Sequence, residues 1–288
     1  MGRGRKSHFR RQDGQRFESK MAPAPWRIVR ASVIGSSHIK AGAQCQDYSL
    51  HELIDCAEGE SVLVAVISDG AGSAEQAAVG SSTACHALVA LVRLFIASGG
   101  TVSSLDRTQA ESWVKQISEQ LERTASETSH NIRDYACTLL AAIIGNDAAA
   151  FIQIGDGAIV ISHGEEDGWS WVFWPQHGEF ANTTNFVVSD NALQVLEFEL
   201  APRPIDEIAL FTDGIENLVL HQSSKTVHDP FFNALLKPIR QSPTSGHDET
   251  LSEKLKVYLA SPVFCERTDD DKTLLIASRR SEPAGKMA

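Results

Sequence analysis

Apolar residues along this chain gather in short runs that end in acidic residues. Residues 62–67 are six consecutive apolar residues, four of them β-branched, and the dipeptide Asp69-Gly70 follows closely. Such a run is typical of a strand that is buried on both faces. Residues 208–211 repeat the pattern and lead to Asp213. The pattern predicts two buried strands that each carry a carboxylate at the C-terminal end.

A third acidic group lies near the C-terminus. Residues 269–271 are three consecutive aspartates, and a strand is predicted directly after them, over residues 273–278. The three groups converge if their strands meet at one end of a sheet. Clustered carboxylates repel one another unless cations neutralise them, and their hard oxygens suit Mg²⁺ or Mn²⁺. We therefore expect a metal site built from several carboxylates.

Helical periodicity marks four segments that come in pairs. Apolar spacing predicts a helix from Ser73 to about Ala97, with Ser73 and Gln76 as a capping box. A second helix is predicted from Asp106. The other pair is predicted over residues 230–239 and 249–259. Two successive helices are suited to cover one face of a sheet.

Strands account for most of the remaining pattern. They are predicted over residues 28–34, 48–54, 137–144, 148–154, 158–162, 169–174, 185–188 and 193–200, with a polar loop over 35–47. Turn sequences such as Asn146-Asp147 and Gly155-Asp156-Gly157 predict antiparallel hairpins. Short hairpins exclude a doubly wound parallel sheet, so one α+β domain is predicted over residues 26–280.

The composition indicates the cellular compartment of the protein and the kinds of partner it binds. The net charge of −11 argues against general nucleic-acid binding. The five cysteines are scattered and odd in number, which favours reduced thiols in a cytoplasmic protein. Uninterrupted apolar runs are shorter than the roughly 18 residues typical of a membrane helix, so no membrane partner is expected. Residues 1–25 are predicted to be a disordered basic extension, and residues 281–288 a disordered tail.

Several common motifs for catalytic nucleophiles, phosphate-binding loops and zinc sites are missing from the sequence. It contains no Gly-x-Ser-x-Gly elbow, no cysteine followed six positions later by arginine, no Gly-x-x-x-x-Gly-Lys loop and no His-Glu-x-x-His helix. The catalytic chemistry that remains is the activation of water by metal ions that carboxylates hold.

The order of five motifs resembles the metal-dependent serine/threonine protein phosphatases of type 2C, the PPM family, and particularly its bacterial branch. The resemblance covers residues 28–279. The motifs are Asp47, Ser68-Asp69-Gly70, Gly155-Asp156-Gly157, Thr212-Asp213-Gly214 and Asp270-Asp271-x-Thr273.

The resemblance implies a fold, a metal centre and an activity. The implied fold is a four-layer α-β-β-α sandwich, a central antiparallel β-sandwich flanked by paired helices. Two Mn²⁺ or Mg²⁺ ions are implied, and a hydroxide that bridges them would attack phosphorus directly. The implied ligands are Asp47, Asp69, Asp213, Asp270 and the carbonyl of Gly70, with Asp156 at a third, weaker metal position; Asp69 and Asp213 are the central catalytic pair.

The implied biology is signalling by removal of phosphate from phosphoserine and phosphothreonine in proteins, opposite a cognate kinase, by a monomer. Two other functions stay open, namely a catalytically weak regulatory module and a hydrolase of small phosphoesters. Asp271 and Thr273 are expected to be structural and to cap the turn into the last strand.

Two positions depart from the family pattern. The family usually has an arginine five residues before the first metal-linked aspartate, where it contacts the substrate phosphate, and this chain has Gly42. Some members have a histidine directly after the central Asp-Gly, and this chain has Ala71. We predict that His38 contacts the phosphate instead, with Lys40 as the second candidate and Arg267 as the next.

Overall fold

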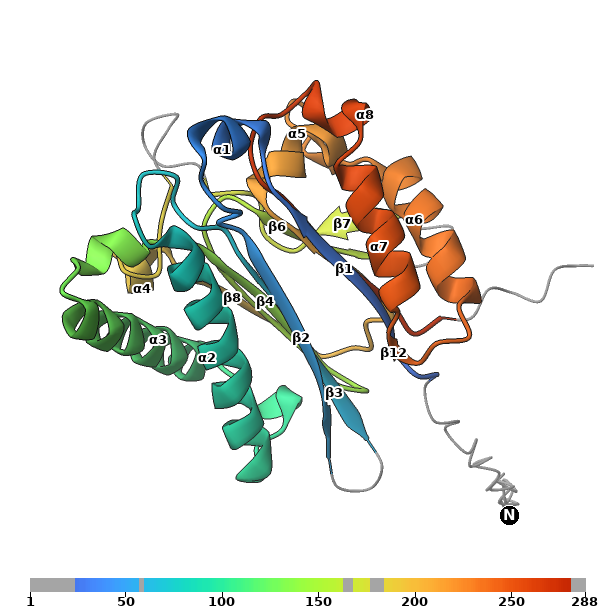
Figure 1. Ribbon diagram of the computed structural model, residues 1–288. Helices are drawn as coiled ribbons and strands as arrows, with labels where there is room; N and C mark the ends of the chain where they lie inside the picture. The colour runs from blue at the N-terminus through green and yellow to red at the C-terminus, as the bar shows by residue number, and fades with distance from the viewer. Residues whose placement is uncertain (1–23, 57–59, 163–167, 177–183, 281–288) are drawn as a thin grey trace, which may run out of the picture.

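The computed structural model describes residues 24–56, 60–162, 168–176 and 184–280 (Figure 1). Within these ranges two main sheets face one another, and helices cover their outer faces, so the fold is mixed α+β as predicted. Of the ends predicted to be disordered, residues 1–25 and 281–288, only residues 24 and 25 are among the described residues.

The larger sheet has six described strands in the order β12-β1-β13-β9-β6-β7. Their bounds are Gly246–His247 (β12), Arg27–Val33 (β1), Lys272–Ser278 (β13), Glu207–Phe211 (β9), Ala158–Ser162 (β6) and Trp169–Trp171 (β7). All its pairings are antiparallel except that of β1 with the two-residue β12, which is parallel. The expected purely antiparallel sandwich is wrong at this edge, because the chain returns from a helix before it pairs with β1.

The smaller sheet has five described strands in the order β2-β3-β4-β5-β8, all antiparallel. Their bounds are Tyr48–Asp55 (β2), Ser61–Ser68 (β3), Leu139–Ile144 (β4), Ala149–Ile154 (β5) and Glu197–Ala201 (β8). The strands β2 and β3 pair along their whole length, with Tyr48 opposite Ser68. A separate two-stranded ribbon joins Leu220–His221 (β10) to Thr226–Val227 (β11).

Two long helices, α2 (Ala77–Ala97) and α3 (Arg107–Thr128), pack on the outer face of the smaller sheet. The helices α6 (Asp229–Gln241) and α7 (Glu249–Leu259) cover the larger sheet. A third apolar cluster lies between the sheets, where Leu63 and Ile67 meet Leu210 and Leu275. The shorter elements are α1 (Ser36–Ala41), α4 (Ala192–Val195), α5 (Glu216–Val219), α8 (Pro262–Cys265), η2 (Val102–Ser104), η3 (Ile132–Tyr135) and η4 (Asp213–Ile215).

Of the two predicted helix caps, one is confirmed and one is wrong. Asp106 caps α3 as predicted, since its carboxylate accepts a hydrogen bond from Gln109 N at 2.8 Å. The predicted Ser73 cap is wrong, because α2 begins after Gln76 and has no side-chain cap. Gln76 N instead donates to the carbonyl of Asp134, so the segment before α2 is tied to η3. The bounds of α7 agree with the prediction.

The secondary structure predicted for three short segments is also wrong. The polar loop predicted over 35–47 contains the short helix α1. Residues 185–188 form a turn rather than a strand, and the predicted strand 193–200 begins as α4 before it becomes β8. Each of these segments is short and partly exposed, so its conformation depends on neighbours that local patterns do not reveal.

The turn Gly155-Asp156-Gly157 does not make a hairpin. It carries the chain from β5 in the smaller sheet to β6 in the larger sheet, and these two strands do not pair. Gly155 has φ of 120°, a conformation that favours glycine, and it lets the chain change direction there. The correction matters for function, because Asp156 thereby lies where the two sheets meet.

By length and composition alone, helix α2 is long and apolar enough to cross a membrane, although polar residues interrupt its apolar sequence. Ala84, Leu88 and Val92 are buried in the cluster between α2, α3 and the smaller sheet. Packing in this core accounts for the apolar character of the helix.

Candidate metal centre

Three aspartates from distant parts of the chain come together at one end of the two sheets. Asp69, Asp156 and Asp213 each offer a carboxylate oxygen, and these oxygens all lie within 4.8 Å of one another. Asp69 follows β3, and Asp213 follows β9 after one residue. Asp156 belongs to the crossing turn between the sheets. The buried strands therefore bring three carboxylates to one place.

Hydrogen bonds to Thr138 fix the position of Asp69. Asp69 N donates to Thr138 Oγ1 at 2.9 Å, and Thr138 N donates to the carbonyl of Asp69 at 2.8 Å. Ser68 Oγ donates to the carbonyl of Thr138 at 2.5 Å. Gly70 N donates to the carbonyl of Gln46 at 3.2 Å, which ties the Asp-Gly turn to the segment before β2.

Asp47 lies at the start of β2 and is 5% exposed. Its Oδ2 accepts a hydrogen bond from Thr212 Oγ1 at 2.7 Å. Its Oδ1 is buried and has no hydrogen-bond partner among the described residues, and the same holds for Asp213 Oδ1. Buried oxygens without donors are costly unless a ligand approaches them.

Asp156 is the third member of this group, and Asp270 is close enough for its charge to act on the other two. Asp156 is buried, and its Oδ2 accepts a hydrogen bond from Thr184 Oγ1 at 2.5 Å. Asp270 is half-buried, and its Oδ1 accepts from Asp271 N at 2.8 Å. The negative charge of Asp270 acts on both Asp69 and Asp213.

Burial and mutual repulsion raise the pKa values of the aspartates. Burial raises the pKa of Asp47 to about 8. Burial, followed by the charges of Asp156 and Asp270, raises the pKa of Asp213 to about 7. Burial and then the charge of Asp47 hold the pKa of Asp69 well above its ordinary value. The site therefore favours uptake of positive charge, from protons or from cations.

The residues present fit a divalent cation. All the candidate side-chain ligands are carboxylate oxygens, the kind that Mg²⁺ and Mn²⁺ prefer. Two of these buried oxygens, Asp47 Oδ1 and Asp213 Oδ1, receive no hydrogen bond from the part of the chain that the structure describes. Asp47, Asp69, Asp156, Asp213 and Asp270 would hold the cations.

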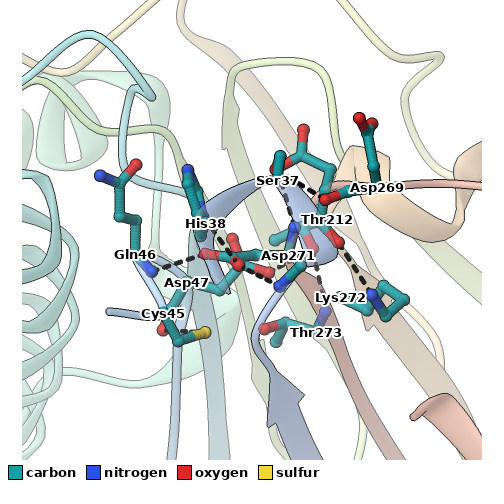
Figure 2. Close-up of polar contacts among 12 residues, drawn as sticks. Ser37, His38, Cys45, Gln46, Asp47, Thr212, Asp269, Asp271, Lys272 and Thr273 are labelled. Carbon is teal, nitrogen blue, oxygen red and sulfur yellow. Dashed lines mark hydrogen bonds and ion pairs between the residues drawn. The ribbon is translucent and has the colours of Figure 1, made fainter. Parts of the chain in front are cut away.

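Of the predicted phosphate contacts, His38 and Lys40 lie on α1, and Arg267 follows α8. His38 Nδ1 is 2.9 Å from Asp271 Oδ1, so Asp271 occupies one side of the imidazole. Figure 2 shows the two side chains together. Lys40 and Arg267 are exposed, and Ala71 is buried. Gly42 ends α1 in the left-handed conformation. These predicted contacts with phosphate stay predictions.

Sequence reasoning missed three threonine hydroxyl groups that position the aspartates, one through the Asp69 backbone and two through carboxylates. Thr138, Thr184 and Thr212 each form a hydrogen bond described above, and none was a candidate. Thr212 directly precedes Asp213, so its place in the motif was the one available signal. Thr138 and Thr184 have no comparable signal, because their partners lie at least 28 positions away in sequence.

Comparison with known proteins gives concordant matches. Residues 34–260 match the family described as protein phosphatase 2C. Over 252 residues the chain is 34% identical to serine/threonine-protein phosphatase 3 of Escherichia coli K12, covering 88% of this chain and 98% of that protein.

Solved structures share the fold at lower identity. The serine/threonine phosphatase Stp1 from Staphylococcus aureus aligns with a TM-score of 0.56 at 15% identity, covering 92% of this chain and 98% of that one. The catalytic domain of the phosphatase PstP, solved in complex with two manganese ions, aligns with a TM-score of 0.55 at 14% identity, covering 88% and 98%.

Proposed function

This chain belongs to the protein phosphatase 2C family, and from that premise we propose that it removes phosphate from phosphoserine and phosphothreonine in proteins, using divalent cations held by its aspartates. The observation that carries the proposal is the convergence of Asp69, Asp156 and Asp213 within 4.8 Å. The relatives suggest the reaction, and the carboxylates supply the chemistry it needs.

Each aspartate has a separate task in this proposal. Asp69 and Asp213 hold the central pair of cations, Mn²⁺ or Mg²⁺, and Asp47 and Asp270 complete the set with the Gly70 carbonyl. Asp156 serves a third, weaker position. Bound divalent cations lower the pKa of water and neutralise charge that develops on phosphoryl oxygens. Thr212 and Thr184 keep Asp47 and Asp156 oriented.

We further propose that the layered sheets and helices form the four-layer sandwich of the family, with antiparallel pairing apart from β12. The proposed setting is the cytoplasm, where the chain would act as a monomer opposite a Ser/Thr kinase. Support for that compartment comes from the described cysteines, all of which are free thiols.

The proposal is tested by metal-dependent turnover of a phosphothreonine peptide and of an aryl phosphate. We expect turnover with Mn²⁺ or Mg²⁺ and none in excess chelator. Asp69→Asn should abolish turnover at an unchanged fold. Asp55→Asn is the matched control, because Asp55 is an exposed carboxylate at the opposite end of β2 from Asp47.

Three results would redirect the proposal. Full turnover in chelator would exclude the metal mechanism. Turnover of the aryl phosphate together with inert phosphopeptides of varied sequence would favour a small-molecule substrate. Metal binding without hydrolysis of either would favour a regulatory module.

A further inference from the structure

Helix α1 is attached to the domain by polar contacts rather than by an apolar face. None of its six residues is buried, and Ile39 is 60% exposed. Ser37 N and Ser37 Oγ both donate to the carbonyl of Asp269, at 2.9 and 2.7 Å. In Figure 1, α1 lies at the same end of the sheets as α5 and α8. Hydrogen bonds to the acidic turn 269–271, rather than apolar packing, therefore hold α1 against the domain.

The Asp271 carboxylate makes three contacts with the segment that contains α1. Asp271 is 2% exposed, and its Oδ1 accepts a hydrogen bond from Gly35 N at 2.6 Å. The same oxygen lies 2.9 Å from His38 Nδ1, and Oδ2 accepts from Gln46 N at 2.6 Å (Figure 2). One buried side chain thus contacts the residue before α1, the helix itself and the residue before Asp47.

Gln46 also contacts the turn Asp69-Gly70, which carries another candidate metal ligand. The carbonyl of Gln46 accepts hydrogen bonds from Gly70 N at 3.2 Å and from Ser81 Oγ at 2.6 Å. Gln46 therefore joins Asp271, the Asp69-Gly70 turn and α2. Asp47 follows Gln46 in the chain, and Asp270 precedes Asp271, so these bonds fix three of the candidate ligands relative to one another.

Asp271 is itself poorly suited to bind a cation. Each of its oxygens accepts a hydrogen bond from a backbone N–H, and an N–H directs positive charge at the oxygen it contacts. Its role must therefore be exerted through its neighbours.

We propose that Asp271 is a positioning residue that sets the relative placement of Asp47, Asp69 and Asp270 before cations bind and keeps α1 ordered beside the site. The consequence for turnover rests on the proposed phosphatase function. The consequences for backbone order and for metal affinity do not require that function.

Asp271→Ala tests the proposal, with Asp269→Ala as the matched control. Asp269 is an exposed aspartate two positions away, and its contact with Ser37 is made by the backbone carbonyl, which alanine retains. Asp271→Asn is a milder variant, since one amide oxygen can accept one of the two N–H groups while its NH₂ opposes the other.

Amide hydrogen exchange of residues 34–47 and Mn²⁺ titration by calorimetry are the readouts, both on the full chain. In Asp271→Ala we expect faster exchange across α1 and about tenfold weaker Mn²⁺ binding, the scale for loss of charge-assisted hydrogen bonds. Asp269→Ala should match the wild type, and Asp271→Asn should lie between. If Asp271→Ala loses turnover because it binds Mn²⁺ weakly, excess Mn²⁺ should restore turnover. Excess Mn²⁺ should not restore turnover to a protein that is generally misfolded.

Wild-type exchange and wild-type Mn²⁺ affinity in Asp271→Ala would overturn the proposal. If that variant does not fold, Asp271→Asn decides, and its equality with the wild type in both measurements would overturn the proposal as well. A wild-type protein without phosphatase activity would refute the proposed function alone, because exchange and Mn²⁺ binding are measured without substrate.

Discussion

Thr212 Oγ1 donates a hydrogen bond to Asp47 Oδ2 at 2.7 Å, joining residues that lie 165 positions apart in the sequence. Thr212 follows β9 of the larger sheet, and Asp47 precedes β2 of the smaller one. The same hydroxyl oxygen accepts a hydrogen bond from Thr273 N at 3.0 Å, so a third strand fixes its orientation. This bond holds the two sheets together at the metal centre and orients a buried carboxylate.

Thr212→Val should weaken Mn²⁺ binding about tenfold. The substitution keeps the side-chain shape and removes the donor that stabilises the Asp47 anion, so protons compete better with the metal. Calorimetric titration measures the change. Thr212→Ser, which keeps the hydroxyl, is the control, and equal affinities in the two variants would show that the hydrogen bond does not matter.

The metal-free protein should lose stability as the pH rises from 6.5 to 8.5. The pKa of Asp47 is raised to about 8 and that of Asp213 to about 7, so the folded state keeps protons that the unfolded state has released. Stability from that uptake is lost as the pH rises through the folded-state values. Saturating Mn²⁺ should reverse the trend, because it replaces the protons.

Thermal unfolding at several pH values, with and without Mn²⁺, tests this prediction. Below pH 6.5 the opposite effect enters, because burial, then Arg30 and His247, lowers the pKa of His51 to about 4. A metal-free melting temperature that climbs between pH 6.5 and 8.5 would contradict the expectation.

Gly214→Ala should destabilise the protein strongly. A Cβ at Gly214 would lie 1.8 Å from the carbonyl oxygen of Asp271, so the two metal-linked turns would have to separate. We expect a loss of about 3 kcal/mol, the upper end for overpacking, together with weaker Mn²⁺ binding. Gly72→Ala is the control, since among the described residues no heavy atom beyond its chain neighbours lies within 4 Å of its added Cβ. Denaturant unfolding compares the two, and equal stabilities would show that the turns can move apart freely.

Lys40→Ala and His38→Ala test the phosphate contact. Loss of the side chain that contacts phosphate should raise KM by about tenfold, as expected for one charge-assisted hydrogen bond. His38→Ala should in addition loosen α1, because it removes the contact with Asp271. Steady-state kinetics at saturating Mn²⁺ separate the two effects. If both variants keep the wild-type KM, Arg267 becomes the candidate to replace.

Deletion of residues 1–20 should leave the melting temperature and aryl-phosphate turnover unchanged. The segment is basic and poor in apolar residues, so it cannot bury much surface by itself. A clear drop in either quantity would show that its basic residues dock on the acidic domain.

Features that depend on residues close together in the chain could be predicted from the sequence. The apolar runs before Asp69 and Asp213 predicted two buried strands that end in carboxylates, and both strands form as predicted. Asp106 and the bounds of α7 were also predictable, because caps and helical spacing act within a few residues. These signals located the acidic motifs, and the family resemblance gave their order.

The residues that these elements contact could be identified only in the folded protein. The turn at Asp156 reads locally as a hairpin, yet it crosses between the sheets and so reaches Asp69 and Asp213. Asp271 reads as a turn cap, yet its carboxylate contacts Gly35 and Gln46 more than 220 positions away. Local patterns predicted backbone conformation correctly in the long, regular elements, because they act through adjacent residues. The burial of two sheet faces against each other, which sums over the whole chain, decides which distant carboxylates and hydroxyls meet.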